Sequence, residues 1–505
     1  MDFDLFLNGF LSIFQLKPML MVFLGATGGI MIGSLPGLTA TMGVALLVPF
    51  TFGLPIGEAM GMLLGIFSGA IYGGSISAIL IRTPGTPAAA ATLLDGYPMT
   101  KRGEAGRALS ISVFSSFIGG LTGALIMTFL SPQISRVALE FSAAEYFALA
   151  IFGLSIIISV SGGSIIKGIM AGFFGLLIST IGFDPVSGFP RFTFGSMDLL
   201  EGPAFIPTLI GLFAFSEVFK GVETLATSKQ VVSRITSLLP SWADIKATWK
   251  DILKSSVMGT FIGSIPGAGS DIAAFVGYSE AKRRSKNPEK FGKGAIEGVA
   301  AAESANNACT GGAMIPLLSL GIPGDAVTAV LLGAFIIQGL RPGPLLYRDH
   351  MDVVYSVFAA MIMANIAMFI VGLLGVRFFA KIISIRKSLL LPIIFLLSIV
   401  GSYSMRNSLF DIWVALCFGV IGYVLQRNRF PVSPILLALI LGPMAEANLR
   451  RSLIINDGSI MAVISRPITA TFLILGLLSL VTSVLRQNRM NQRLAELTAQ
   501  ADDDD

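Results

Sequence analysis

Long apolar stretches separated by short polar segments fill most of the chain. A helix needs roughly 20 apolar residues to cross a bilayer core of about 30 Å, so the pattern predicts an all-α polytopic membrane protein with about 12 transmembrane helices. Two short stretches, 38–52 and 326–340, flank Pro-Gly pairs and are predicted to be re-entrant or broken half-helices. The apolar stretches lie approximately at 19–35, 38–52, 59–81, 109–130, 144–160, 165–182, 203–219, 256–276, 298–320, 326–340, 353–375, 389–404, 411–425, 432–447 and 462–484.

Two polar segments suggest how the chain is organised. The first, 220–254, contains six Lys or Arg residues and is predicted to be a linker on the membrane surface. It would join a first half at 1–219 to a second half at 255–485. Residues 486–505 end in a run of aspartates and are predicted to form a polar cytoplasmic tail.

A motif that occurs twice relates the two halves. Ile32-Gly33-Ser34-Leu35-Pro36-Gly37 reappears 230 residues later as Ile262-Gly263-Ser264-Ile265-Pro266-Gly267. A second pair, Thr83-Pro84-Gly85 and Ile322-Pro323-Gly324, is separated by 239 residues. The difference of nine residues fits in the hydrophilic insert at 282–290. Each half is therefore predicted to carry two Pro-Gly helix breaks.

The charges of equivalent loops predict that the two halves have opposite orientations. The loop at 282–293 carries six Lys or Arg residues, whereas its counterpart at 53–57 carries none. Three basic residues mark the first half's next loop, 101–107, and its counterpart at 341–352 mixes both signs. Because basic loops stay in the cytoplasm, we predict two inverted structural repeats, with elevator-like transport and scaffold parts by analogy. Two parallel halves, or chance Pro-Gly matches, are the alternatives.

Composition narrows the classes of function. Hydrophobic residues make up 54% of the chain and charged residues only 13%, against about 25% charged in a typical soluble domain. Cys309 and Cys417 lie far apart in apolar stretches, and His350 is the single histidine. We therefore expect neither a disulfide framework nor a transition-metal site. The net charge of +5 is spread over loops, which argues against nucleic acid as a partner.

The Pro-Gly breaks supply the candidate chemistry. Proline lacks an N–H and glycine tolerates unusual dihedrals, so each pair ends a helix at bilayer depth and frees backbone N–H and C=O groups. The positive N-terminal end of a half-helix attracts an anion, and freed carbonyls hold a cation. These groups together suit a symporter that moves an anion with a cation.

The residues around the breaks are the candidate binding residues, and none is assigned a catalytic role. For any one Ser or Thr, a hydrogen bond to its own helix is the alternative. The substrate-binding set is Ser34, Pro36, Gly37, Thr39, Ser75, Arg82, Thr83, Pro84, Gly85, Thr86, Pro266, Gly267, Asn306, Asn307, Gly311, Gly312, Pro323 and Gly324. The cation-coupling set is Asp271, Asp325, Ser264, Ser270 and Thr310.

Ionisable side chains inside apolar stretches are costly, which makes them functional candidates. Asp271 and Asp325 follow breaks, either as cation ligands or as caps of the next half-helix. Arg82 precedes a break and would pair with a negative group of the substrate, or else snorkel or pair with an acidic side chain. Glu303 shares a predicted helix with Asn306-Asn307, whose amides face a cavity or bond between helices.

Short strings in a fixed order occupy two regions, 25–110 and 258–345. In the first they are Gly33-Ser34-Leu35-Pro36-Gly37-Leu38, Tyr72-Gly73-Gly74-Ser75, Thr83-Pro84-Gly85-Thr86-Pro87 and Asp95-Gly96-Tyr97-Pro98-Met99. In the second they are Ile265-Pro266-Gly267-Ala268-Gly269, Glu303-Ser304-Ala305-Asn306-Asn307-Ala308, Gly311-Gly312 and Leu320-Gly321-Ile322-Pro323-Gly324. Taken together, they resemble the large membrane subunit of the tripartite tricarboxylate transporter family.

This resemblance implies secondary active uptake of a di- or tricarboxylate in bacteria, driven by a Na+ or H+ gradient rather than by ATP. It also implies a place in the inner membrane and no cofactor apart from Na+ as a candidate coupling ion. Two partners follow from it: an extracytoplasmic solute-binding protein and a small membrane subunit of about four spans.

Two other classes of function are the alternatives. An intramembrane hydrolase or protease needs a nucleophile and a base, but the chain has no Gly-x-Ser-x-Gly elbow and its single histidine lies outside the repeated motifs. We therefore expect that the protein is not an enzyme. A passive anion channel would more naturally be built as a ring of identical subunits than from break motifs duplicated in one chain.

Overall fold

The computed structural model describes residues 3–160, 164–223, 239–383, 385, 387–404 and 406–503, with the side chains of 486–503 left out of the description. Its elements up to residue 223 are α1 (Phe3–Ile13), α2 (Leu16–Ser34), α3 (Ala40–Leu47), η1 (Val48–Thr51), α4 (Ile56–Ile81), η2 (Pro87–Ala89), α5 (Leu93–Lys101), α6 (Ala105–Ala138), α7 (Ala143–Val160), α8 (Ile165–Ser179), β1 (Gly182–Phe183), β2 (Pro190–Arg191), η3 (Met197–Leu199), α9 (Phe205–Leu209), η4 (Ile210–Phe215) and α10 (Ser216–Glu223). The later elements are α11 (Trp242–Gly263), α12 (Gly269–Arg284), η5 (Pro288–Lys290), α13 (Ile296–Leu320), α14 (Ala326–Ile337), α15 (Pro344–Asp349), α16 (Met351–Ile382), α17 (Lys387–Ser404), α18 (Leu409–Arg427), α19 (Ser433–Ile455), α20 (Ile460–Ile464) and α21 (Pro467–Asp503).

The predicted fold class is confirmed: the protein is an all-α polytopic membrane protein. In the described ranges, β1 and β2 pair as one short antiparallel hairpin, and nearly everything else that is regular is helical. Seven of the described helices are long and apolar enough to cross a membrane, and five shorter apolar helices accompany them. The figure of about 12 crossings remains a prediction, because length and composition alone identify fewer full spans.

The chain forms two compact units, each assembled from two separate segments. One comprises 1–139 and 205–423, and it contains every Pro-Gly break of the repeat. The other comprises 140–204 and 424–505, and holds α7, α8, the hairpin and α19 to α21. The predicted division into two halves remains a prediction.

The predicted polar linker and tail are covered only in part. Within the linker, 224–238 lie outside the described residues, whereas 242–254 form the first part of the long helix α11. The predicted tail at 486–505 continues α21 as far as Asp503, and 504–505 lie outside the described residues. In these regions the described backbone is therefore mostly helical.

Glycines hold α2 tightly against α4 in the first repeat. A Cβ placed on Gly29 would lie 2.4 Å from the carbonyl oxygen of Ile66, and one on Gly33 would lie 2.2 Å from that of Ala70. A real Cβ never approaches an oxygen so closely. Because both contacts advance in the same direction along the two helices, α2 and α4 run parallel.

The second repeat uses the same contacts at equivalent positions. A Cβ on Gly259 of α11 would lie 2.2 Å from the carbonyl oxygen of Ala305 in α13, and one on Gly263 would lie 2.5 Å from that of Cys309. Gly259 and Gly263 follow Gly29 and Gly33 by 230 residues, and Ala305 and Cys309 follow Ile66 and Ala70 by 239 residues. These are the two spacings of the sequence motifs. The predicted internal repeat is therefore a structural repeat of helix pairs.

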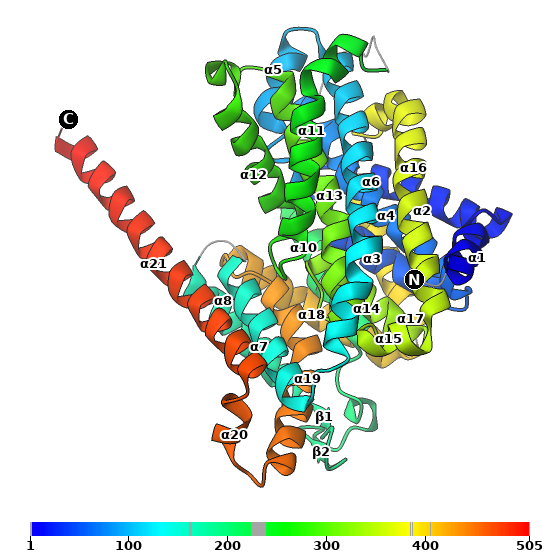
Figure 1. Ribbon diagram of the computed structural model, residues 1–505, viewed down its shortest axis with the longest axis vertical. Coiled ribbons are helices and arrows are strands. Elements are labelled where there is room, and N and C mark those ends of the chain that lie inside the picture. The colour runs from blue at the N-terminus through cyan, green and yellow to red at the C-terminus, as the bar shows by residue number, and fades with distance from the viewer. Residues whose placement is uncertain are drawn as a thin grey trace. The chain divides into compact units, whose positions relative to one another are not determined.

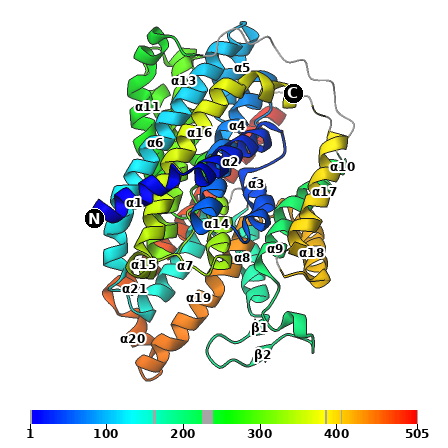
Figure 2. The same ribbon diagram turned by 90° about the vertical axis from the view of Figure 1, so that its right-hand side faces the viewer.

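The two repeats are inverted, as predicted. Near one end of α4, the carbonyl oxygen of Ile79 accepts a hydrogen bond from the Thr100 hydroxyl of α5 at 2.8 Å. The same short helix meets the beginning of α13, where the Ala295 N–H donates to Asp95 at 2.8 Å. Further from α5, the Asn307 amide of α13 donates to the carbonyl oxygen of Ser68 in α4 at 3.5 Å. The equivalent helices α4 and α13 therefore run antiparallel, and α5 lies at one end of both (Figure 1, Figure 2).

The two basic loops lie on the same side of the protein, as their charges predict. The Arg102 guanidinium donates to the carbonyl oxygens of Lys293 at 3.0 Å and Gly294 at 2.6 Å. Their counterparts are also joined, because the Gln338 side chain just after α14 donates to the carbonyl oxygen of Thr51 at 3.1 Å. Each pair thus combines one loop from each repeat, the arrangement that inversion requires.

Substituting Gly33 by Ala tests the close packing of α2 on α4. The added methyl group has no room beside Ala70, so Gly33→Ala is expected to cost about 1–3 kcal/mol of stability. Gly28→Ala is the matched control on the same helix, because no atom lies within 4 Å of its Cβ position. Thermal unfolding of the two purified variants should show a lowered midpoint for Gly33→Ala alone; equal midpoints would refute the tight contact.

Candidate functional site

All four Pro-Gly pairs interrupt helices, as predicted. The breaks separate α2 from α3, α4 from η2, α11 from α12, and α13 from α14. Each break is about five residues long. The break at 264–268 lies inside a predicted apolar stretch, and each of the other three adjoins the end of one. What the breaks bind remains a prediction, but their backbone geometry can be followed residue by residue.

In the first repeat the two breaks come together. The Gly85 N–H donates to the carbonyl oxygen of Gly74 at 3.1 Å, so the chain after α4 folds back on that helix. A Cβ on Gly85 would lie 1.9 Å from the carbonyl oxygen of Gly33, at the end of α2. Gly37 has φ +96°, which glycine adopts without strain, and Thr39 caps α3 by accepting from the Met42 N–H at 3.2 Å.

In the second repeat the breaks are joined directly. The Gly267 N–H donates to the carbonyl oxygen of Gly324 at 2.6 Å. A Cβ on Gly324 would lie 2.6 Å from the Cα of Ala313, which occupies the position equivalent to Gly74. Both repeats therefore bring their second break back onto their second long helix by close backbone contacts.

The carboxylates near the breaks have different environments. Asp325 caps α14: its Oδ1 accepts from the Thr328 N–H and hydroxyl, both at 2.8 Å, and its own N–H donates to that hydroxyl at 2.8 Å. Of the two roles that the sequence left open for Asp325, cation ligand or helix cap, the structure shows the helix cap. Asp271 is exposed in the first turn of α12. In the first repeat the equivalent positions hold Thr86 and Thr41, so these two carboxylates have no acidic counterparts there.

Arg82 lies apart from the buried part of the site. It ends α4 in a left-handed conformation with φ 58° and is exposed. Its guanidinium carbon lies 5.9 Å from the centroid of the Tyr97 ring, and the Lys101 amine lies 5.2 Å from the same centroid. Its described contact is thus a cation–π contact, and its role toward substrate remains a prediction.

Several predicted hydroxyls bond to their own helices. They are Ser34 to the carbonyl oxygen of Met31 at 2.8 Å, Ser75 to Tyr72 at 2.8 Å, Ser264 to Phe261 at 2.7 Å, and Thr310 to Asn307 at 2.7 Å. Gly311 and Gly312 bring helices together, because a Cβ would lie 2.3 Å from Gly123 backbone and 2.2 Å from the Thr260 carbonyl oxygen respectively. These positions therefore have a structural role, which leaves their binding role untested.

The paired asparagines connect α13 to the first repeat. The Asn306 amide donates to the carbonyl oxygen of Ala88, beside the second break, at 3.2 Å. The Asn307 amide donates to the carbonyl oxygen of Ser68 in α4 at 3.5 Å. Both side chains are fully buried, and their Oδ1 atoms have no hydrogen-bond donor among the described residues. These two carbonyl oxygens are therefore buried acceptors whose hydrogen-bonding capacity the described residues leave unused.

Glu303 belongs to the buried site but was not in the predicted set. Its side chain is fully buried on α13 and receives hydrogen bonds from Thr92, Ser116 and Asn306, among others. Its acidic side chain inside an apolar stretch marked it as a functional candidate in the sequence, but no binding role was predicted for it. Apart from Asn306 on the same helix, its partners come from two distant parts of the chain, α6 and the segment before α5, so spacing alone does not reveal them.

Asp95 is a second missed residue, with a positioning role. Its Oδ1 accepts the backbone N–H groups of Gly292, Gly294 and Ala295 at 2.8, 2.7 and 2.8 Å. The carboxylate thereby ties α5 of the first repeat to the start of α13 in the second. This contact fixes where Asn306 and Glu303 stand relative to the first repeat.

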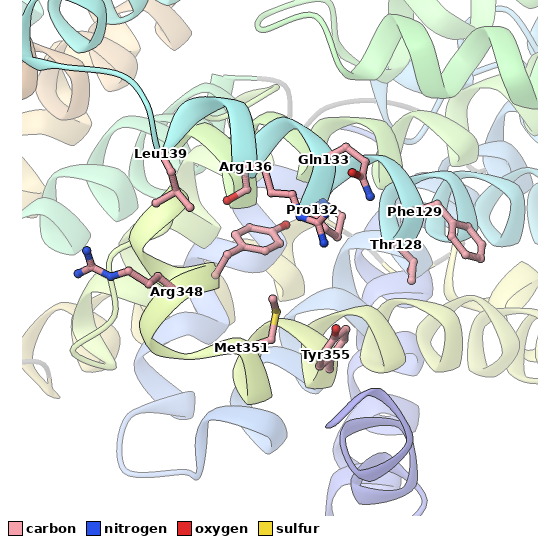
Figure 3. A pocket seen from close by; sticks show the side chains of 11 residues that line it. Thr128, Phe129, Pro132, Gln133, Arg136, Leu139, Arg348, Met351 and Tyr355 are labelled. Carbon is pink, nitrogen blue, oxygen red and sulfur yellow. The ribbon is translucent and has the colours of Figure 1, made fainter. Parts of the chain in front are cut away.

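A separate cavity of about 480 Å³ lies between α6, α15 and α16, and no residue of the four breaks lines it. Figure 3 shows Phe129, Pro132 and Gln133 of α6 on one side and Met351 and Tyr355 of α16 on the other. Its wall is mainly apolar, and Tyr347 in that wall is hydrogen-bonded to Ser131 of α6. No predicted site residue lines it.

Comparison with known proteins indicates the same family as the sequence motifs. Residues 19–437 match a family model described as "Tripartite tricarboxylate transporter TctA family". The chain is similar to an Agrobacterium vitis protein named "Uncharacterized 52.8 kDa protein in TAR-I ttuC' 3'region", with 38% identity over 463 residues that cover 92% of each chain. It is also similar to the A. vitis "Uncharacterized protein in TAR-II ttuC' 3'region", with 40% identity over 227 residues, 45% of this chain and 94% of the relative. No solved structure matches it.

Replacing Asp325 separates its capping role from its charge. Asp325→Ala removes the acceptor for the Thr328 N–H and should cost about 1 kcal/mol of stability, whereas Asp325→Asn keeps a good capping residue and should cost less. Thermal unfolding of the purified variants measures both. If Asn and Ala destabilise equally, the charge rather than the cap holds this end of α14.

Proposed function

Because the chain belongs to the tripartite tricarboxylate transporter TctA family, we propose that it is the large membrane subunit of a secondary active transporter that imports a di- or tricarboxylate together with Na+ or H+. The observation that best supports this proposal is the meeting of paired helix breaks in two inverted repeats. Inverted broken helices give one central site that opens to either side of the membrane in turn. We assign no catalytic role to any residue.

The breaks of the first repeat are the proposed site for the carboxylate. They carry hydroxyl side chains, among them Thr39 at the start of α3 and Thr86 after Pro84-Gly85. Thr86 is buried, and its hydroxyl has no hydrogen-bond partner in the described part of the chain. Hydroxyls and a positive helix end donate to a substrate carboxylate without repelling it.

The breaks of the second repeat are the proposed site for the coupling cation. Asp271 and Asp325 stand where the first repeat has threonines, so negative charge gathers on this side of the repeat. Oxygen ligands from carboxylates, Ser270 and freed carbonyls suit a hard cation such as Na+. This asymmetry between otherwise equivalent breaks supports two different ligands, one anionic and one cationic.

The proposal extends to location and partners. A TctA-family subunit belongs to a tripartite system, so we propose that a small membrane subunit of about four spans and an extracytoplasmic solute-binding protein complete this one. The binding protein would deliver the carboxylate at the outer face of a bacterial inner membrane. Movement of the break-bearing repeats against the remaining helices, as in an elevator, would carry it across.

Reconstitution into liposomes tests the proposed activity. With both partner subunits present, an imposed Na+ or pH gradient should drive accumulation of a radiolabelled tricarboxylate above its external concentration without ATP. An ionophore that dissipates the gradient should abolish this accumulation. Flux that only equilibrates the two sides would instead show a passive channel and would contradict the proposal.

Arg82 tests the extent of the substrate site. If its guanidinium pairs with a substrate carboxylate, Arg82→Gln should raise KM about tenfold, because a charge-assisted hydrogen bond contributes roughly 1.5–3 kcal/mol. Lys101→Gln is the matched control, since both cations lie near the ring of Tyr97. An unchanged KM for Arg82→Gln would assign Arg82 to packing alone.

A further inference from the structure

Glu303 is a carboxylate completely enclosed by neutral donors. Its Oε1 accepts from the Thr92 hydroxyl at 2.5 Å and from the Asn306 amide at 3.2 Å. Its Oε2 accepts from the hydroxyls of Ser116 at 2.8 Å and Ser112 at 3.3 Å. The side chain has no exposed surface. All the donors come from uncharged groups on α13, on α6 and on the segment before α5.

The surrounding helices bring no positive charge to this carboxylate. Among the described residues, no Lys, Arg or His forms an ion pair with Glu303. The titratable group that faces it from α4 is the phenol of Tyr72. Glycines bring the other helices close to this part of α13, α11 at Gly259 and α12 at Gly277. The next titratable groups along α13 are Asp95 of α5 and Tyr278 of α12, which lie against Gly298 and carry no positive charge. A lone negative charge at this depth is costly, and one bound proton removes it.

A chain of hydroxyls can accommodate both the charged and the neutral acid. The Ser112 hydroxyl also lies 2.8 Å from that of Ser75, which in turn lies 2.8 Å from the carbonyl oxygen of Tyr72. With Glu303 ionised, Ser112 donates to Oε2. With Glu303 protonated, its new O–H donates to Ser112, Ser112 donates to Ser75, and Ser75 donates to the backbone carbonyl. Every hydroxyl keeps an acceptor in both states.

Hydrogen bonds also connect Glu303 to the segment after the Pro84-Gly85 break, which belongs to the proposed carboxylate site. The Asn306 amide that donates to Glu303 also donates to the carbonyl oxygen of Ala88, in the segment that follows the Pro84-Gly85 break. Thr92, at the end of that segment, donates to Glu303 directly. Protonation weakens both bonds, because a neutral acid is a poorer acceptor than a carboxylate. The bound proton therefore changes what holds the break in place.

We propose that Glu303 is a proton-binding site of the transport cycle, distinct from the carboxylates at the second-repeat breaks. The inference rests on the proposed function and names one of its coupling ions. A proton from the outer side forms the O–H bond at Oε2, the Ser112 hydroxyl turns from Oε2 to Ser75, and the site moves with its substrate. On the inner side the same O–H bond breaks and the proton leaves, which restores the Glu303 carboxylate for the next cycle.

The test compares coupled and uncoupled transport in proteoliposomes that contain a pH-sensitive dye. Glu303→Gln keeps the size and the acceptor of the side chain but cannot exchange a proton. Exchange of labelled for unlabelled carboxylate needs no net movement of protons, so Glu303→Gln should retain a larger share of wild-type exchange than of wild-type net uptake. Its substrate-dependent proton uptake, and its uptake driven by a pH gradient, should fall to the level of protein-free liposomes.

Three results would overturn the inference. One is proton uptake with carboxylate by Glu303→Gln at the wild-type ratio, which would move the proton to another group. Another is a stably folded Glu303→Gln that has lost exchange as well, which would make Glu303 a structural residue. The third is a wild-type protein that accumulates carboxylate with Na+ but never with protons. Absence of any carboxylate transport by wild type would instead refute the proposed function itself.

A second pair of variants keeps the test decisive if Glu303→Gln fails to fold. Ser112→Ala removes the hydroxyl that both states of Glu303 use, and should displace the pH of half-maximal uptake by about half a unit or more. Ser115→Ala is the matched control, because its buried hydroxyl on the same helix has no hydrogen-bond partner in the described part of the protein. Identical pH profiles for both variants and wild type would also overturn the inference.

Discussion

The need to satisfy backbone polar groups inside a membrane governs this structure. A helix that stops at bilayer depth exposes N–H and C=O groups that lipid cannot bond, so such breaks persist only where protein or ligand covers them. Here backbone contacts with a neighbouring helix or another break cover them. Gly85 bonds to Gly74 in the first repeat, and Gly267 bonds to Gly324 in the second. At Gly85 and Gly324 glycine is required because the backbones approach more closely than a side chain allows.

The same constraint links the duplicated, inverted repeat to the proposed transport function. Inverting the repeat places α4 and α13 antiparallel and brings the basic loops of both repeats to one side. The backbones of the two repeats are then nearly symmetric, but the side chains at their breaks differ. Threonines occupy the first repeat where Asp271 and Asp325 occupy the second. In the account proposed above, the symmetric backbone provides alternating access, while the asymmetric side chains separate anion from cation.

The sequence predicted those features that depend on local chemistry. Pro-Gly pairs end helices wherever they occur, and loop charges follow the orientation of the chain, so the breaks and the inversion could be read before the fold was known. The two roles of Asp325 could not be separated, because capping depends on whether Thr328 turns its N–H toward the carboxylate. The surroundings of Glu303 were the feature that the sequence could least predict. Thr92 and Ser116 reach it only after helices distant in sequence have packed together.

The most direct test of alternating access is chemical labelling of a single cysteine at Thr39. Cys309 and Cys417 are first replaced by serine, and a membrane-impermeant thiol reagent is then applied from each side in turn. A central site between inverted repeats predicts that position 39 reacts from both faces and that bound carboxylate slows the reaction on each. Labelling from one face only, with no protection by carboxylate, would contradict it.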